Sequence, residues 1–294
     1  MQTRWRLASP AAMVLGLACL TVGAPARAQL PTFSSKVEVV RVDVLVTQSG
    51  RPILGLRSSD FELRDNGVRQ EIEFAALEKL PLRLILALDS SDSVAGVRMM
   101  HLRAACEAVL DRLQKEDEAA LITFNHTLVL GSPFTSDLGR VRTALRAVAP
   151  GGETALIDAL YAGMVLGEAG SGRGLMVAFT DGADTSSFLR SQEVQDVAKS
   201  SDVVVYPVTS GRNGRRLTSF LRGIADQTGG RLFEVESTPD LQKAFVAILD
   251  EFRQRYVLAF RPQSVTKGGW HRLDVLVKGR PFDVRARAGY QGGQ

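Results

Sequence analysis

Short apolar segments alternate with longer segments of helical spacing over residues 80–253. The strand-like segments 82–88 and 174–180 are almost continuously apolar, which is typical of parallel strands buried on both faces. The segment 97–113 repeats its apolar residues at helical spacing. Further strands are expected at 119–124, 127–132, 203–208 and 231–235, and further helices at 138–148, 155–167, 191–200, 217–227 and 241–252. This alternation predicts an α/β domain with a doubly wound, mostly parallel sheet and helices on both faces.

The segments on either side of this domain are strand-like. Within 34–78, valines recur at every second position from Val40 to Val46, and Asp65-Asn66-Gly67 is a hairpin signal between two strand-like runs, FEL and IEF. The segment 255–291 also alternates in the strand period. Because so few strands are rarely stable alone, we expect both flanks to pack together into one small antiparallel β module, with the α/β domain inserted between them.

The N-terminal segment 1–28 has the features of an export signal. A positive start, an apolar run at 11–22 and the small residues Ala26 and Ala28 predict cleavage near Ala28-Gln29. The mature protein is then expected to be secreted, or to reside in the periplasm or cell envelope. An uncleaved anchor is the alternative, but the run is too short to span a bilayer comfortably. No other segment has about 20 apolar residues, so we expect no transmembrane segment in the mature chain.

Composition and charge exclude several classes. With 45% hydrophobic and 23% charged residues, the chain can bury the core of a globular protein. Residues 1–28 carry three arginines and no acids, so the mature net charge is +4 − 3 = +1. This does not indicate a nucleic-acid partner. Only Cys106 follows the predicted signal, so no intramolecular disulfide is expected.

Polar residues occur in three separate loops that a doubly wound fold brings to the same edge of the sheet. The residues are Asp89, Ser91, Ser93, Thr154 and Asp181. In such folds ligands bind outside the carboxyl ends of the strands. Two carboxylates and three hydroxyls suit a hard cation such as Mg²⁺, or Mn²⁺ or Ca²⁺. The three histidines stand far apart in the chain, which disfavours zinc.

Helix capping is the alternative explanation for these residues. Ser93 and Thr154 each precede a predicted helix, and Asp181-Gly182 is a plausible turn. A fold that keeps the three motifs for capping, with no metal bound, therefore stays open at the level of sequence.

The pattern D-x-S-x-S at 89–93, followed by Thr154 and Asp181, resembles the metal-ion-dependent adhesion site of von Willebrand factor type A and integrin inserted domains. The resemblance covers about 175 residues. It implies that Ser91 and Ser93 bind the metal directly, that Thr154 joins them in the ligand-bound state, and that Asp89 and Asp181 act through water. Mostly neutral ligands leave the cation able to attract an acidic side chain of a protein partner.

Two further points of comparison concern this family. Asp92 lies between the two serines, where many members have glycine. The flanks also resemble a bacterial group of VWFA-related proteins of acidobacterial type. Their shared elements are Gly55-Leu56, Asp60-Phe61, Asp65-Asn66-Gly67, Gln70-Glu71-Ile72 and Gly289-Tyr290.

A phosphatase and an assembly scaffold are the alternatives to an adhesion protein. A phosphatase using Asp89 would want an acid where Ser91 stands and a downstream lysine, but no lysine occurs between Lys115 and Lys199. Neither G-x-S-x-G nor a Walker motif occurs, so no enzymatic activity is expected. A structural envelope or assembly scaffold would use the same surface as a ligand-binding protein, and the sequence does not separate the two.

Overall fold

The computed structural model describes residues 39–77, 80–170, 172–211 and 214–293 of the chain. The predicted export signal lies outside the described residues. Among the helices of the described ranges, none is both long and apolar enough to cross a membrane.

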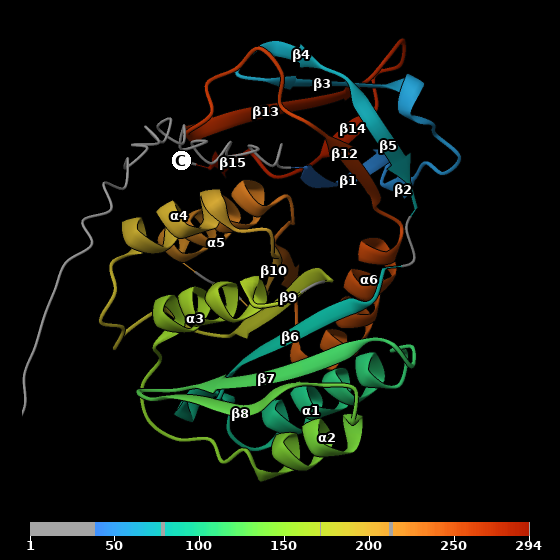
Figure 1. Ribbon diagram of the computed structural model, residues 1–294. Helices are drawn as coiled ribbons and strands as arrows, with labels where there is room; N and C mark the ends of the chain where they lie inside the picture. The colour runs from blue at the N-terminus through green and yellow to red at the C-terminus, as the bar shows by residue number, and fades with distance from the viewer. Residues whose placement is uncertain (1–38, 78–79, 171, 212–213, 294) are drawn as a thin grey trace, which may run out of the picture. The chain divides into compact units, whose positions relative to one another are not determined.

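The central element is a six-stranded sheet (Figure 1). Its strands are β6 (Leu82–Asp89), β7 (Glu118–Phe124), β8 (Leu128–Thr135), β9 (Arg173–Thr180), β10 (Val204–Ser210) and β11 (Phe233–Val235). They lie in the order β11-β10-β9-β6-β7-β8. All neighbours are parallel except β7 and β8, which form an antiparallel pair at one edge. The sheet is therefore mixed but mostly parallel.

Six helices cover the two faces of this sheet. They are α1 (Val97–Leu110), α2 (Leu138–Ala147), α3 (Leu156–Glu168), α4 (Ser191–Ser200), α5 (Arg215–Thr228) and α6 (Leu241–Arg253). Helices α1, α2 and α6 share a core with Leu84 and Leu86 of β6, whereas α3, α4 and α5 share another with Ile85 and Ala87. Successive residues of β6 thus serve opposite faces, as the strand period requires. This explains why β6 is continuously apolar.

The flanking segments form two antiparallel sheets. One has the order β14-β1-β12-β5, with β2 paired to β1, and the other has the order β15-β13-β3-β4. Their bounds are β1 (Val40–Gln48), β2 (Arg51–Pro52), β3 (Phe61–Asp65), β4 (Val68–Gln70), β5 (Ile72–Ala76), β12 (Tyr256–Phe260), β13 (Gly269–Val277), β14 (Asp283–Arg285) and β15 (Gly289–Gly292). Short 3₁₀ turns occupy Ser58–Asp60, Asp92–Val94 and Thr238–Asp240.

Strands from the two ends of the chain pair directly with one another. β1 runs antiparallel to β12, with Val40 opposite Phe260, and β3 pairs with β13. The alternating valines of β1 share a buried cluster with side chains of both sheets, among them Phe61 and Leu273. The predicted fold class, a doubly wound α/β sheet with a small antiparallel module from both flanks, is confirmed. The exact domain limits, 34–78, 80–253 and 255–291, stay predictions.

The hairpin at Asp65-Asn66-Gly67 differs in part from the expectation. Asn66 and Gly67 have φ angles of 48° and 82°, as a two-residue type I′ turn requires. However, β3 pairs with β4, and the IEF segment of β5 crosses to the other sheet and pairs with β12. The side chain of Gln70 lies where the chain passes from one sheet to the other. It accepts a hydrogen bond from the Gln263 backbone N–H and donates one to the Gln263 backbone carbonyl.

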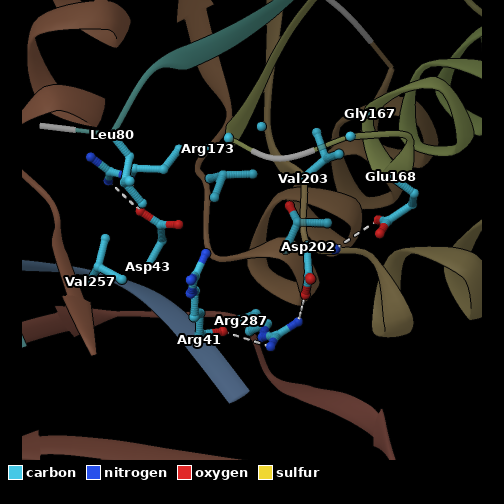
Figure 2. A pocket seen from close by; sticks show the side chains of 15 residues that line it. Arg41, Asp43, Leu80, Gly167, Glu168, Arg173, Asp202, Val203, Val257 and Arg287 are labelled. Carbon is cyan, nitrogen blue, oxygen red and sulfur yellow. Dashed lines mark hydrogen bonds and ion pairs between the residues drawn. The ribbon is translucent and has the colours of Figure 1, made fainter. Parts of the chain in front are cut away.

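Charged side chains line the seam between the β module and the amino ends of β9 and β10. Figure 2 shows Asp43 of β1 paired with Arg173 of β9, and Arg287 paired with Asp202. Arg173 and Arg287 are buried. The Asp43–Arg173 pair is therefore shielded from solvent, whereas the Asp202 carboxylate of the other pair is largely exposed. They border a cavity of about 170 Å³, into which the side chain of Arg41 also projects. Each pair joins a residue of the β module to a residue of the α/β domain, so the seam holds the β module against that domain.

This seam predicts a large stability loss on replacing Asp43 with alanine. The change leaves the buried Arg173 guanidinium without its carboxylate. The carbonyls of Phe252 and Arg255, at 3.3 and 3.5 Å, and the Phe252 ring remain near it, but none of them carries a negative charge. Breaking a buried pair on one side costs about 3–5 kcal/mol. We expect the free energy of unfolding, measured by urea denaturation, to fall by about 3 kcal/mol.

Asp226→Ala is the matched control. Asp226 of α5 pairs with Arg285 of β14 across the same modules at 3.4 Å, but both side chains are about half exposed. Exposed pairs contribute roughly 0–1 kcal/mol, so this variant should unfold close to wild type. Equal losses of stability in the two variants would contradict the conclusion that the buried Asp43–Arg173 pair stabilises the seam more than the exposed pair does.

Candidate functional site

The polar residues singled out in the sequence lie where the order of the sheet reverses. The chain passes from β6 to β7 on one side and later to β9 on the other side of β6. The loops after β6 and β9 therefore leave the sheet in different directions and open a crevice at the carboxyl ends of these two strands. Asp89 is the last residue of β6, and Asp181 follows the last residue of β9.

Asp89 is a fully buried carboxylate held by neutral donors. Its Oδ1 accepts the Ser91 backbone N–H at 2.9 Å, and its Oδ2 accepts the Thr180 hydroxyl at 2.7 Å. Within the part of the chain that the structure describes, Asp89 has no ion-pair partner. Burial raises the pKa of Asp89, the hydrogen bonds from Ser91 and Thr180 oppose this rise, and the nearby charge of Asp181 adds to it.

Ser91, Ser93 and Asp181 form a connected cluster beside Asp89. The two serine hydroxyls lie 3.0 Å apart, and the Ser93 hydroxyl donates to Asp181 Oδ1 at 2.5 Å. Ser91 is buried and Ser93 is exposed, so the cluster extends from the sheet edge to the surface. The structure thus brings four of the five predicted residues together through side-chain contacts or a shared hydrogen-bond network.

Thr154 is brought to the same crevice through its backbone. The loop before it is tied to the 89–93 loop, because Gly151 N–H donates to the Ser90 carbonyl at 2.8 Å and Asp92 N–H donates to the Gly152 carbonyl at 3.0 Å. The Thr154 carbonyl accepts the backbone N–H groups of Thr185 and Ser186, which follow Asp181. Thr154 thereby joins the loops after β6 and β9.

The hydroxyls of this cluster do not cap helices. Helix α1 begins after Gly96 and α3 begins after Ala155, and neither cap uses a side chain. The amide of Ile157, in the first turn of α3, instead donates to Asp184 Oδ1 at 3.2 Å. The capping explanation for Ser93 and Thr154 therefore fails, because Ser93 bonds the Asp181 carboxylate and the side chain bonded to the first turn of α3 through Ile157 is Asp184.

Sequence reasoning missed Arg98, which lies in the first turn of α1. Its guanidinium donates to Asp181 Oδ2 at 3.0 Å and to the Ser93 carbonyl at 2.9 Å. An arginine at this position of a surface helix carries no distinct sequence signal, because only the tertiary fold brings it to Asp181. Asp92 is exposed, as expected for a carboxylate that faces solvent.

The donor set is one of oxygen atoms only. Across the described residues, no group of three or more histidine, cysteine, aspartate or glutamate side chains gathers where it could hold an ion. The crevice instead combines two carboxylates with hydroxyls, a set that fits a hard cation better than zinc or copper. The charged cavity of Figure 2 lies at the opposite, amino ends of β9 and β10 and is a separate feature.

Comparison with known proteins gives the same region a family. The model of the von Willebrand factor type A domain matches residues 84–247. Inter-alpha-trypsin inhibitor heavy chain H2 of Mus musculus is 23% identical over 236 residues, covering 70% of this chain and 24% of the mouse protein. The chain thus spans about a quarter of the length of this relative.

Solved structures share the fold at low sequence identity. A von Willebrand factor type A protein from Catenulispora acidiphila matches with a TM-score of 0.54 and 14% identity, covering 83% of this chain and 76% of that one. The vWF domain of a type V pili tip protein from Porphyromonas gingivalis matches with a TM-score of 0.50 and 13% identity, covering 58% of this chain and 94% of that one. The chain belongs to the von Willebrand factor type A domain family, whose members typically mediate protein–protein interaction or adhesion.

Proposed function

We propose that the cluster at the carboxyl ends of β6 and β9 binds a divalent cation of the Mg²⁺ class and, through it, an acidic side chain of a protein partner. Ser91, Ser93 and Thr154 would hold the cation through their hydroxyls, and Asp89 and Asp181 would act through water. The cation would supply a positive centre for the partner's carboxylate.

The buried, unpaired carboxylate of Asp89 carries this proposal. Isolated buried charges are costly, and proteins keep them mainly where they are paired or coordinate metals. Among the described residues Asp89 has only neutral hydrogen-bond donors, and Asp181 places a second carboxylate nearby. Both observations favour a cation at this position.

The arrangement of the hydroxyls supports the same proposal. Ser91 and Ser93 contact each other and the carboxylates rather than helix ends, so capping does not explain their presence. Neutral ligands would leave most of the charge of a divalent cation uncompensated. An anionic partner would then bind more favourably than a neutral one.

The proposed setting of this interaction is outside the cytoplasm. The export signal predicted at 1–28, with cleavage near Ala28-Gln29, supports it, and the fold is shared with a domain of a pili tip protein. An assembly role, in which the same crevice binds another envelope subunit, uses the same chemistry. We propose no catalytic reaction, because the carboxylates and hydroxyls of the cluster suit coordination.

Metal binding predicts a rise in stability that depends on the cluster. At a Mg²⁺ concentration 100-fold above Kd, the free energy of unfolding should increase by about 2.7 kcal/mol. Calorimetric titration and thermal unfolding of the mature protein would measure it. Asp89→Ala and Ser91→Ala should abolish the effect. Ser200→Ala, which removes an exposed hydroxyl that donates to the Val197 carbonyl, should retain it. A folded wild-type protein with no saturable binding would contradict the proposal.

Arg98 predicts a specific change in metal affinity. Because its guanidinium compensates the charge of Asp181, it competes with a cation for that carboxylate. Arg98→Gln should therefore tighten Mg²⁺ binding by roughly 3- to 10-fold, as expected for a partly exposed charge pair. Arg98→Lys, which keeps the charge, should stay near wild type in the same titration. Weaker binding in Arg98→Gln would instead assign Arg98 to positioning Asp181.

The raised pKa of Asp89 predicts a pH-dependent stability. The folded metal-free protein holds this proton more tightly than the unfolded chain, so its free energy of unfolding decreases as pH rises from the usual aspartate pKa, about 3.9, through the raised value. Asp89→Asn should remove this decrease. At pH 7 we expect it to stabilise the metal-free protein by ~0.5–2 kcal/mol, with little difference from wild type near pH 4. Denaturant unfolding at both pH values measures this, and equal effects at both would contradict it.

A further inference from the structure

The loop that follows Asp181 carries an aromatic side chain that faces solvent. Phe188 is 95% exposed, which is unusual because phenylalanine is among the residue types most often buried. Scattered apolar side chains on a surface are common, whereas exposed apolar groups gathered at a binding site commonly mark contacts with a partner. Phe188 therefore calls for an explanation other than packing within this chain.

Hydrogen bonds fix the backbone around Phe188. The backbone N–H groups of Phe188 and Leu189 each donate to a carboxylate oxygen of Asp158 at 2.9 Å. The Asp158 N–H donates to the Ser187 hydroxyl at 3.2 Å, which in turn donates to Asp184 Oδ1 at 2.5 Å. A loop attached in this way to the first turn of α3 presents its aromatic ring at a defined place. A partner that binds the ring need not order the loop backbone first.

The same loop is attached to the candidate metal site. The backbone N–H groups of Thr185 and Ser186 donate to the Thr154 carbonyl at 2.9 and 3.1 Å, and the Thr154 N–H donates to the Thr185 hydroxyl at 3.0 Å. Phe188 is two positions after Ser186, so their Cα atoms are at most about 7 Å apart. Phe188 thus lies on a loop that is hydrogen-bonded to Thr154.

Helix α3, which carries Asp158, also has apolar side chains that are partly exposed. Asp158, Tyr161 and Val165 are spaced i, i+3 and i+7, which places them on one face of the helix. Tyr161 is 37% exposed and Val165 is 49% exposed. They lie on the face of α3 that begins at Asp158, the residue that holds the Phe188 backbone.

We infer that Phe188 is a second contact for the partner, which presents an acidic side chain to the metal site and an apolar side chain to the aromatic ring. This inference rests on the proposed function and names the chemistry of its partner. The Phe188 Cα lies within about 7 Å of Ser186, which is hydrogen-bonded to Thr154, and an extended chain covers about 3.3–3.6 Å per residue. We therefore expect the apolar residue of the partner within about four positions of its acidic residue. The carboxylate supplies charge complementarity to the cation, and the apolar contact selects among acidic segments.

Fluorescently labelled peptides test this inference. One set carries a single glutamate with a tryptophan two, three or four positions away in a Gly-Ser background, and its matched set has serine in place of tryptophan. Binding to the mature protein is measured by anisotropy in Mg²⁺ and in chelator. In wild type, at least one tryptophan spacing should bind about 3- to 10-fold more tightly than its serine counterpart, as expected for an aromatic pair.

The variant Phe188→Ser should remove this gain and leave the affinity of the serine peptides and of Mg²⁺ unchanged. Its fold should persist, because an exposed side chain is removed. Leu54→Ser, a change at a 56% exposed leucine of the β module, should keep the gain. A gain that is absent, or that survives in Phe188→Ser, overturns the inference while the proposed function stands. No Mg²⁺-dependent binding of any glutamate peptide overturns both. A wild-type dimer in sedimentation that Phe188→Ser abolishes would assign the ring to self-association and overturn the inference.

Discussion

Strand β6 is hydrogen-bonded in parallel to β7 on one side and to β9 on the other, and helices cover both of its faces. Parallel strands need crossover connections, so the chain leaves β6 and β9 toward different helices. In the crevice between these connections, polar groups are not hydrogen-bonded within the sheet, so they can bind a ligand. Asp89 and Asp181 meet there because of this pairing, although 92 positions separate them in the chain.

Charge is distributed differently at the two ends of the sheet. At the amino ends, Asp43 and Arg173 compensate each other and attach the β module. At the carboxyl ends, Asp89 stays without an ion-pair partner among the described residues, and Arg98 compensates only Asp181. Functional sites commonly hold such destabilising groups at the expense of stability elsewhere. The apolar cores around β6 and the buried ion pair of the seam can offset the free-energy cost of burying the Asp89 carboxylate without a positive partner.

Much of the fold followed from local patterns, and the errors lie at tertiary pairing. Each predicted helix between 97 and 252 exists within a few residues, because amphipathic spacing reflects the burial of one face. The type I′ turn at Asn66-Gly67 was also visible, since its backbone requires positive φ angles. The partner of the IEF segment was not, because β5 pairs with β12, which lies far away in the chain, and the nearby bond of Gln70 to Gln263 joins residues 193 positions apart. The bond of Asp184 to the first turn of α3 was missed for the same reason.

The sequence by itself determined the alternation of buried strands and helices, the flanking strands, and the chemical character of the five candidate residues. Those features depend on side-chain type and short spacing, which the chain carries locally. Only the tertiary structure decided that the Ser93 hydroxyl meets Asp181, that Arg98 donates to the same carboxylate, and that Asp158 holds the backbone of Phe188. These contacts join residues 30 to 88 positions apart, and their distances are set by how the strands order and the loops pack.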